Sequence, residues 1–167
     1  IFLKNLSESK ELKQLLKLQD KRMEDRELLL RAISFINNQY TEYEKPLSTF
    51  LDKAMEGLDK FNDFELKEMG EKIISAIELQ KEIFGKHMFS RSILGGKNRV
   101  KLNSALFEVW VALTYKINNN QGFNLIRNKQ DLIQEYKSLL LTNELQNAVV
   151  SSTSSKGSVK IRFESIE

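Results

Sequence analysis

The 167-residue chain contains no cysteine and a single histidine, His87. Without cysteine it can form neither a disulfide framework nor a thiolate zinc site, and it has no cysteine nucleophile. One histidine excludes sites that need two, including those of the paired-histidine metalloproteases. We find no set of nucleophile, base and orienting residue. The sequence therefore predicts no catalytic residues, no metal site and no cofactor for this part of the protein.

Long hydrophobic runs are also missing. No stretch approaches the roughly 18 apolar residues of a membrane-spanning helix, and residues 1–30 lack the pattern of a signal peptide. The chain starts at Ile1 rather than at a methionine, so we expect a piece of a longer protein. Hydrophobic residues make up 41% and charged residues 29% of the sequence, a balance typical of soluble globular proteins. Its length suits one domain over 1–167.

Only one proline and seven glycines interrupt the chain, which favours helices over a β fold with its many turns. The sequence predicts an all-α bundle of about six helices with three loops. The segment 104–117 is apolar nearly all round, so we expect it at the centre. Gly85 is the expected end of the helix at 63–84. Apolar spacing predicts helices over 8–18, 24–37, 63–84, 104–117, 129–143 and a segment after Pro46, with loops at 38–46, 86–101 and 145–157. The tail 158–166 fits a strand or a helix, and we favour a helix.

Positive charge is concentrated in two windows. Between Glu82 and Glu108 there are five basic residues and no acid, and between Glu144 and Glu164 there are three basic residues and no acid. The first window contains Gly95 and the second a serine-rich run, so main-chain N–H groups, hydroxyls and cations are available to phosphate oxygens. The alternative is that both are solvated loops with incidental charge. The candidate phosphate-binding or nucleic-acid-binding residues are Arg91, Lys97, Arg99, Lys101, Ser152, Thr153, Lys156 and Arg162.

Three other residues stand out. Glu108 lies on an otherwise apolar helix, where a carboxylate is costly unless it is paired. Arg31 is its expected partner in a structural polar pair, and a catalytic role for Glu108 is the weaker alternative. His87 is interpreted as structural or exposed, because no nucleophile accompanies it. Phe89 is the one aromatic residue placed among cations as a base-stacking side chain would be.

The segment 22–33 (RMEDRELLLRAI) is similar to a charged helix of the GmrSD-type restriction proteins, which contain the domain of unknown function 262. The segment 46–55 (PLSTFLDKAM) after Tyr40, the residues Phe84, Gly85, Phe89 and Arg91, and the helix 101–109 (KLNSALFEV) are similar to further elements of the family. The tail 152–163 resembles its basic end segment, although with fewer cations, and Asp52 stands where the family often has asparagine.

The resemblance implies a prokaryotic, cytoplasmic protein that acts against foreign or modified DNA. The chain would be the helical half that follows a ParB-like nucleotidase domain, but the family's DGQQR motif is absent, so no catalytic role is carried over. The expected partners are DNA and the missing nucleotidase domain, without a membrane, and self-association is left open. Two functions remain open. One is a module that contacts DNA or nucleotide phosphates through its basic loops, and the other is a structural module that docks the nucleotidase domain.

Overall fold

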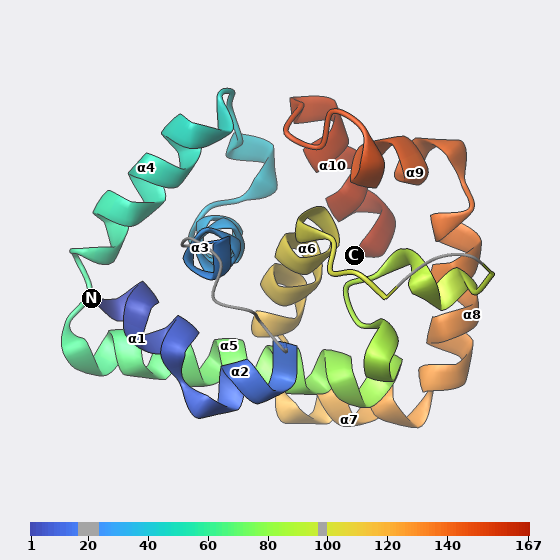
Figure 1. The fold of residues 1–167 in the computed structure, drawn as a ribbon, viewed down its shortest axis with the longest axis horizontal. Coiled ribbons are helices and arrows are strands. Elements are labelled where there is room, and N and C mark those ends of the chain that lie inside the picture. The colour runs from blue at the N-terminus through green and yellow to red at the C-terminus, as the bar shows by residue number, and fades with distance from the viewer. Residues whose placement is uncertain (17–23, 97–99) are drawn as a thin grey trace.

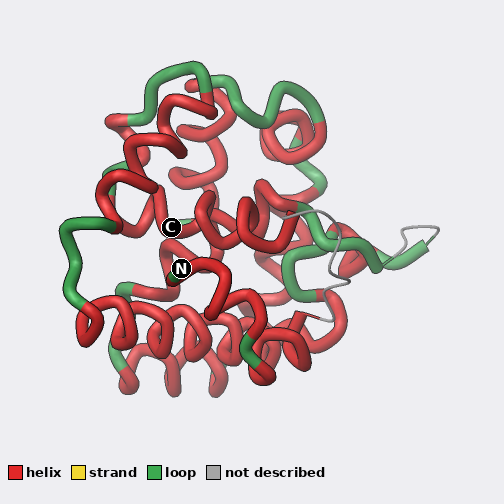
Figure 2. The backbone as a smooth tube through the Cα atoms, turned by 60° about the vertical axis from the view of Figure 1, so that its left-hand side comes forward, coloured by secondary structure: helices red, strands yellow, loops and turns green. Residues whose placement is uncertain are grey.

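A computed structural model describes residues 1–16, 24–96 and 100–167. Within these ranges the protein is all-α and has no strand, and short loops connect the helices (Figures 1 and 2). None of the described helices combines the length and the apolar character that crossing a lipid bilayer requires. The helices are α1 (Phe2–Glu8), α2 (Lys10–Leu16), α3 (Glu24–Asn37), α4 (Leu47–Leu58), α5 (Asp63–Phe84), α6 (Ser104–Tyr115), α7 (Asn119–Arg127), α8 (Lys129–Leu140), α9 (Asn143–Val150) and α10 (Lys156–Ile166). Three short 3-10 turns are η1 (Tyr40–Glu42), η2 (Gly85–His87) and η3 (Arg91–Leu94).

Helix α6 is the centre of the bundle, as its apolar sequence predicts. It packs against α3, α5 and α10, and Figure 1 shows it between α3 on one side and the segment that follows α5 on the other. Its side chains are buried on all faces over most of its length, including those of Phe107 and Trp110. A helix with no polar face has to be enclosed by its neighbours, since any exposed side would leave apolar area in water.

The helix ends follow from local chemistry. Asn62 caps α5 by accepting a hydrogen bond from the Glu65 N–H at 3.0 Å, and the Glu65 carboxylate accepts one from the Asn62 N–H at 2.8 Å. This reciprocal pair is the capping box. At the other end Gly85 adopts φ +57°, a backbone conformation that favours glycine, and it stops α5 as the sequence predicts. The 3-10 turns η2 and η3 then form the segment leading back to α6.

The sequence-based boundaries hold for the long helices and change for the short ones. Helices 24–37 and 63–84 are confirmed, and the tail is helical. The single helix expected over 8–18 is instead two helices, because Ser9 adopts an extended ψ of 143° between them; residues 17–18 lie outside the described ranges. The loop expected at 145–157 is wrong in its first half, since α9 continues to Val150. With α7, which the apolar spacing does not predict, the described residues form ten helices rather than six.

Candidate functional site

A groove of about 1600 Å³ opens between the start of α3, the second half of α5 and residues of 85–91 and 100–104. Helix α6 begins at its edge, where Asn103 caps the helix by accepting a hydrogen bond from the Leu106 N–H at 3.0 Å. The Asn103 amide also donates to the Val149 carbonyl at 2.8 Å, which ties this edge to α9. The groove is therefore built on fixed helix ends, a common way to hold a binding site rigid.

The first basic window forms one side of this groove. Its described members that line the groove are Lys86, Arg91 and Lys101. In the described part of the chain no ion pair involves any of the three. The buried Nε atom of Arg91 also has no hydrogen-bond partner there. The predicted site residues Lys97 and Arg99 lie outside the described residues.

Hydrogen bonds between neighbouring residues fix the main chain around these cations. The Ser90 hydroxyl accepts hydrogen bonds from the N–H groups of Ser92 at 3.2 Å and Lys101 at 3.3 Å. The Asn103 N–H donates to the Phe89 carbonyl at 2.8 Å. These hydrogen bonds join residues 89–92 to residues 101–103. They hold Arg91 and Lys101 on the same side of the groove.

The opposite sides of the groove are mainly acidic. Five carboxylates from α3 and α5 line it, together with two cations, Arg31 and Lys81. Glu82 forms an ion pair with Lys129 at 3.6 Å, whereas Glu24 and Glu78 have no ion pair among the described residues. Among the described residues that line the groove, charge is thus partly separated, with cations on one side and mainly carboxylates on the others. The carboxylates are Glu24, Asp25, Glu27, Glu78 and Glu82.

The second basic window does not take part in the groove, and the structure gives each of its cations a carboxylate partner. Lys156 is paired with Glu44, and Lys160 lies 3.6 Å from Glu164. Arg162 is fully buried and paired with Glu108. The prediction that Arg162 meets an external phosphate is therefore wrong for this structure, because its guanidinium is inside the core.

The serine-rich run of that window is used by the fold. Arg162 Nη1 donates to the carbonyls of Ala148 at 2.8 Å and Thr153 at 2.7 Å. The Tyr43 hydroxyl donates to the Ser154 carbonyl at 2.7 Å, and the Ser155 hydroxyl caps α10 by accepting from the Ser158 N–H at 3.0 Å. Ser152 is exposed and has a φ of +50°. Neither Ser152 nor Thr153 lines the groove.

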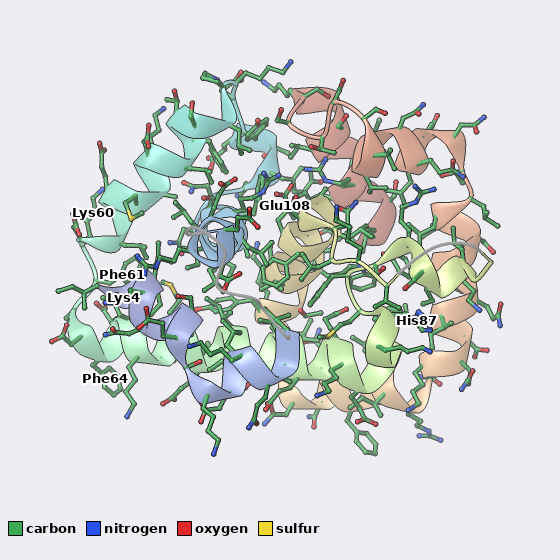
Figure 3. All side chains as sticks on the ribbon, in the orientation of Figure 1. Lys4, Lys60, Phe61, Phe64, His87 and Glu108 are labelled. Atoms are coloured by element: carbon green, nitrogen blue, oxygen red, sulfur yellow. The ribbon has the colours of Figure 1, made fainter. Side chains whose placement is uncertain are left out.

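Glu108 joins two arginines in the core. The predicted pair is present, since Arg31 Nε donates to Glu108 Oε2 at 2.9 Å. Arg162 binds the other oxygen, Oε1, of the same carboxylate. Burial lowers the pKa of the Arg162 guanidinium, and the Glu108 carboxylate opposes that shift. Figure 3 labels Glu108 at the start of α6, and the carboxylate links α3, α6 and α10.

Arg31 has a second role in the geometry, because it also lines the groove. Its Nε is fixed by Glu108, while its Nη1 atom lies 3.8 Å from the exposed carboxylate of Glu27. The side chain is 11% exposed. A guanidinium held from behind through Nε keeps its other N–H donors in a fixed orientation, and these are available at the wall of the groove.

Burial and contacts show what Phe89 and His87 do in the fold. Phe89 is 1% exposed and packs edge-on against Phe107, with 4.9 Å between ring centroids, so it is a core residue and not a base-stacking one. His87 Nδ1 lies 2.9 Å from the Ser92 hydroxyl. Ser92 is only 3% exposed, so this serine–histidine contact is internal to the η2–η3 segment, in line with a structural role. Phe89 was not identifiable as buried from the sequence, because the cations Lys86 and Arg91 flank it.

Comparisons with known proteins add no relative. No protein-family model, no curated protein and no solved structure matches the chain.

Proposed function

We propose that the chain is a helical module of a nucleotide-dependent DNA restriction protein of the GmrSD type, and that it contacts phosphates through the side of the groove formed by 85–91 and 100–104. The observation that carries the proposal is the placement of Lys86, Arg91 and Lys101 on one side of a large groove without ion-pair partners among the described residues. Cations that the fold leaves unneutralised are free to replace the counterions of a nucleic acid.

The residues of the groove support contact with phosphate rather than catalysis. No group of three or more acidic or histidine side chains that could hold a metal is present among the described residues. The one histidine is bonded to a buried serine. The chemistry of the proposed parent protein would then reside in its other domains, and this chain would supply binding.

The test is the salt dependence of duplex DNA binding by the 167-residue chain and two charge-reversal variants. In the first variant Lys86, Arg91 and Lys101 are changed to glutamate. In the matched control the same change is made at three exposed lysines outside the groove. Figure 3 labels two of these control lysines, Lys4 and Lys60, at a different corner of the molecule from Glu108 and His87. The control residues are Lys4, Lys60 and Lys116.

The groove variant is expected to lower the slope of log affinity against log salt by about 0.9 for each phosphate of duplex DNA that it no longer neutralises. The control variant carries the same net charge, so it is expected to weaken binding without a comparable change in slope. Equal slopes for the two variants, or a slope near zero for the unmodified chain, would contradict the proposal.

A docking module is the second candidate, and one observation favours it. Phe64 at the start of α5 is 74% exposed and Met55 on α4 is 46% exposed. Figure 3 shows Phe64 with Phe61 at the corner where α4 meets α5. Large exposed aromatic side chains are common anchors of protein interfaces. A Phe64→Ala variant that leaves DNA binding unchanged but loses association with the proposed neighbouring nucleotidase domain would support docking.

A further inference from the structure

The charge separation across the groove has a consequence for the ligand it can hold. Carboxylates from α3 and α5 face the groove from sides other than the cationic one. Duplex DNA lying along the groove would bring phosphates against these carboxylates. Each such pair of like charges costs about 1 kcal/mol at 4 Å even in bulk water, and more where water is excluded. A polyanion therefore fits better along the side formed by 85–91 and 100–104 than across these carboxylates.

A ligand with an anionic group at one end and hydrogen-bond donors at the other fits the groove better. Phosphate matches the donors of Lys86, Arg91 and Lys101, and the fixed guanidinium of Arg31 lies at the same groove. Carboxylates accept hydrogen bonds from N–H groups, as they do from the amino group of cytosine. Glu24 and Glu78, which have no ion pair within the described ranges, are suited to that end.

Apolar side chains supply the remaining surface. Six aliphatic or methionine side chains line the groove, and Val100, next to Lys101, is 58% exposed. A flat ring can lie against such side chains and bury its faces. The side chains are Leu15, Leu16, Leu28, Met88, Val100 and Leu102.

We infer that the groove receives a single nucleotide unit, with its phosphate on the side formed by 85–91 and 100–104 and the amino edge of its base at the carboxylates of α3 and α5. The inference rests on the proposed phosphate-binding function and names the ligand unit. The unit is either a free nucleotide or the terminal, unpaired nucleotide of a strand, which share this chemistry. A base with an exocyclic amino group is preferred over one with a carbonyl oxygen at the same position, because a carboxylate repels that oxygen.

The experiment compares cytidine 5′-monophosphate with uridine 5′-monophosphate in calorimetric titrations of the 167-residue chain. The two ligands differ in the donor or acceptor character of positions 3 and 4 of the base. Hydrogen bonds to charged groups contribute roughly 1.5–3 kcal/mol, and 1.4 kcal/mol corresponds to a tenfold change, so cytidine monophosphate is expected to bind about tenfold more tightly or better. A 5′-phosphorylated single strand ending in cytidine or in uridine separates the two sources of the ligand.

Two sets of variants test the two ends of the site separately. Glu24→Gln with Glu78→Gln is expected to reduce the preference for cytidine to near unity, because a glutamine amide can donate as well as accept. Changing Lys86 and Lys101 to alanine is expected to lower the affinity for both nucleotides by the same factor. The matched control, Glu56→Gln with Glu135→Gln, removes two exposed carboxylates outside the groove and is expected to leave both affinities unchanged.

The outcomes distinguish this inference from the proposed function. Equal affinities for the two free nucleotides and for the two strand ends would overturn it, as would the absence of binding by all four ligands, even if duplex DNA binding kept its dependence on Lys86, Arg91 and Lys101. Binding by the strand ends alone, with cytidine preferred, would support it and assign the site to nucleic acid. Loss of both nucleotide binding and salt-dependent DNA binding would reject the inference and the proposed function together.

Discussion

Removing the charge of Glu108 is expected to destabilise the protein far more than removing any exposed carboxylate. Glu108 is 1% exposed and is bound by Arg31 and Arg162, and Arg162 is fully buried. A Glu108→Gln substitution keeps the shape of the side chain but leaves two guanidinium groups without their common counterion. Breaking a buried ion pair from one side costs about 3–5 kcal/mol. For a domain of this size each kcal/mol lowers the melting temperature by about 2–4 °C, which gives a decrease of roughly 6–20 °C.

The assay is urea and thermal unfolding followed by circular dichroism, with Glu164→Gln as the matched control. Glu164 also pairs with a basic residue of α10, Lys160, at 3.6 Å, but both side chains are more than half exposed. Exposed pairs contribute about 0–1 kcal/mol, so the control is expected to change the unfolding free energy little. A loss below about 1 kcal/mol for Glu108→Gln would refute the reasoning, because uncompensated charges cannot be buried at so small a cost.

Replacing the whole cluster tests the same physics in the opposite direction. In a triple variant Arg31 and Arg162 become methionine and Glu108 becomes leucine, so no charge is left buried. Replacing buried ionic clusters by apolar residues of similar volume is often neutral or stabilising, by about 1–4 kcal/mol. The triple variant is therefore expected to be at least as stable as the unmodified chain in urea unfolding. If it were less stable than Glu108→Gln, the hydrogen bonds of Arg162 to the main chain would outweigh the cost of burying the charges.

For three further perturbations the structure determines whether stability rises or falls. Burial raises the pKa of the Tyr43 and Tyr136 hydroxyls, so above pH 10 the unfolded chain loses protons that the folded chain retains. Stability is expected to fall with rising pH from about 10, by up to roughly 1.4 kcal/mol per pH unit and tyrosine, and Tyr136→Phe should flatten the fall in urea titrations. Gly85→Ala, at φ +57°, is expected to cost about 1–2 kcal/mol. Gly57→Ala, within α4 and with nothing within 4 Å of an added methyl, is expected to stabilise by up to about 1 kcal/mol in the same melting assay; the same sign for both glycines would contradict the explanation. Asn103→Ala removes the cap of α6 and the bond to α9 and is expected to cost about 1–2 kcal/mol in denaturant unfolding; no loss would contradict the capping role.

The sequence predicts the fold where helices are long and their apolar residues regular. The helices 24–37 and 63–84 are confirmed because several turns of periodic residues bury one face against α6. Helix α7 has no buried residue, and of its apolar side chains only Leu125 and Ile126 pack partly against the core. Its capping box, in which Asn118 and Gln121 bind each other's main-chain N–H, is the signal that was available in the sequence.

The candidate site shows a different kind of limit. Two windows without acids look alike in sequence, yet one lines a groove, and in the other two of the three cations are neutralised by carboxylates far along the chain. Glu44 lies 112 residues before Lys156, and Glu108 lies 54 residues before Arg162. Charge counted along a window cannot include such partners, because they meet only when helices pack. The Arg31–Glu108 pair was predictable because a single carboxylate on an apolar helix requires a cation.

The two arginines of the core connect these observations. Arg162 fills one side of the Glu108 carboxylate from α10, and Arg31 fills the other from α3 while its remaining donors line the groove. A carboxylate shared by two guanidinium groups leaves one positive charge that it does not compensate, and the exposed Glu27 carboxylate, 3.8 Å from Arg31 Nη1, meets that excess at the groove. The second basic window thus contributes to the groove indirectly. By occupying Glu108, Arg162 leaves Arg31 with an exposed and weaker partner, Glu27, and makes the groove more attractive to an anion than Arg31 paired alone with Glu108 would make it.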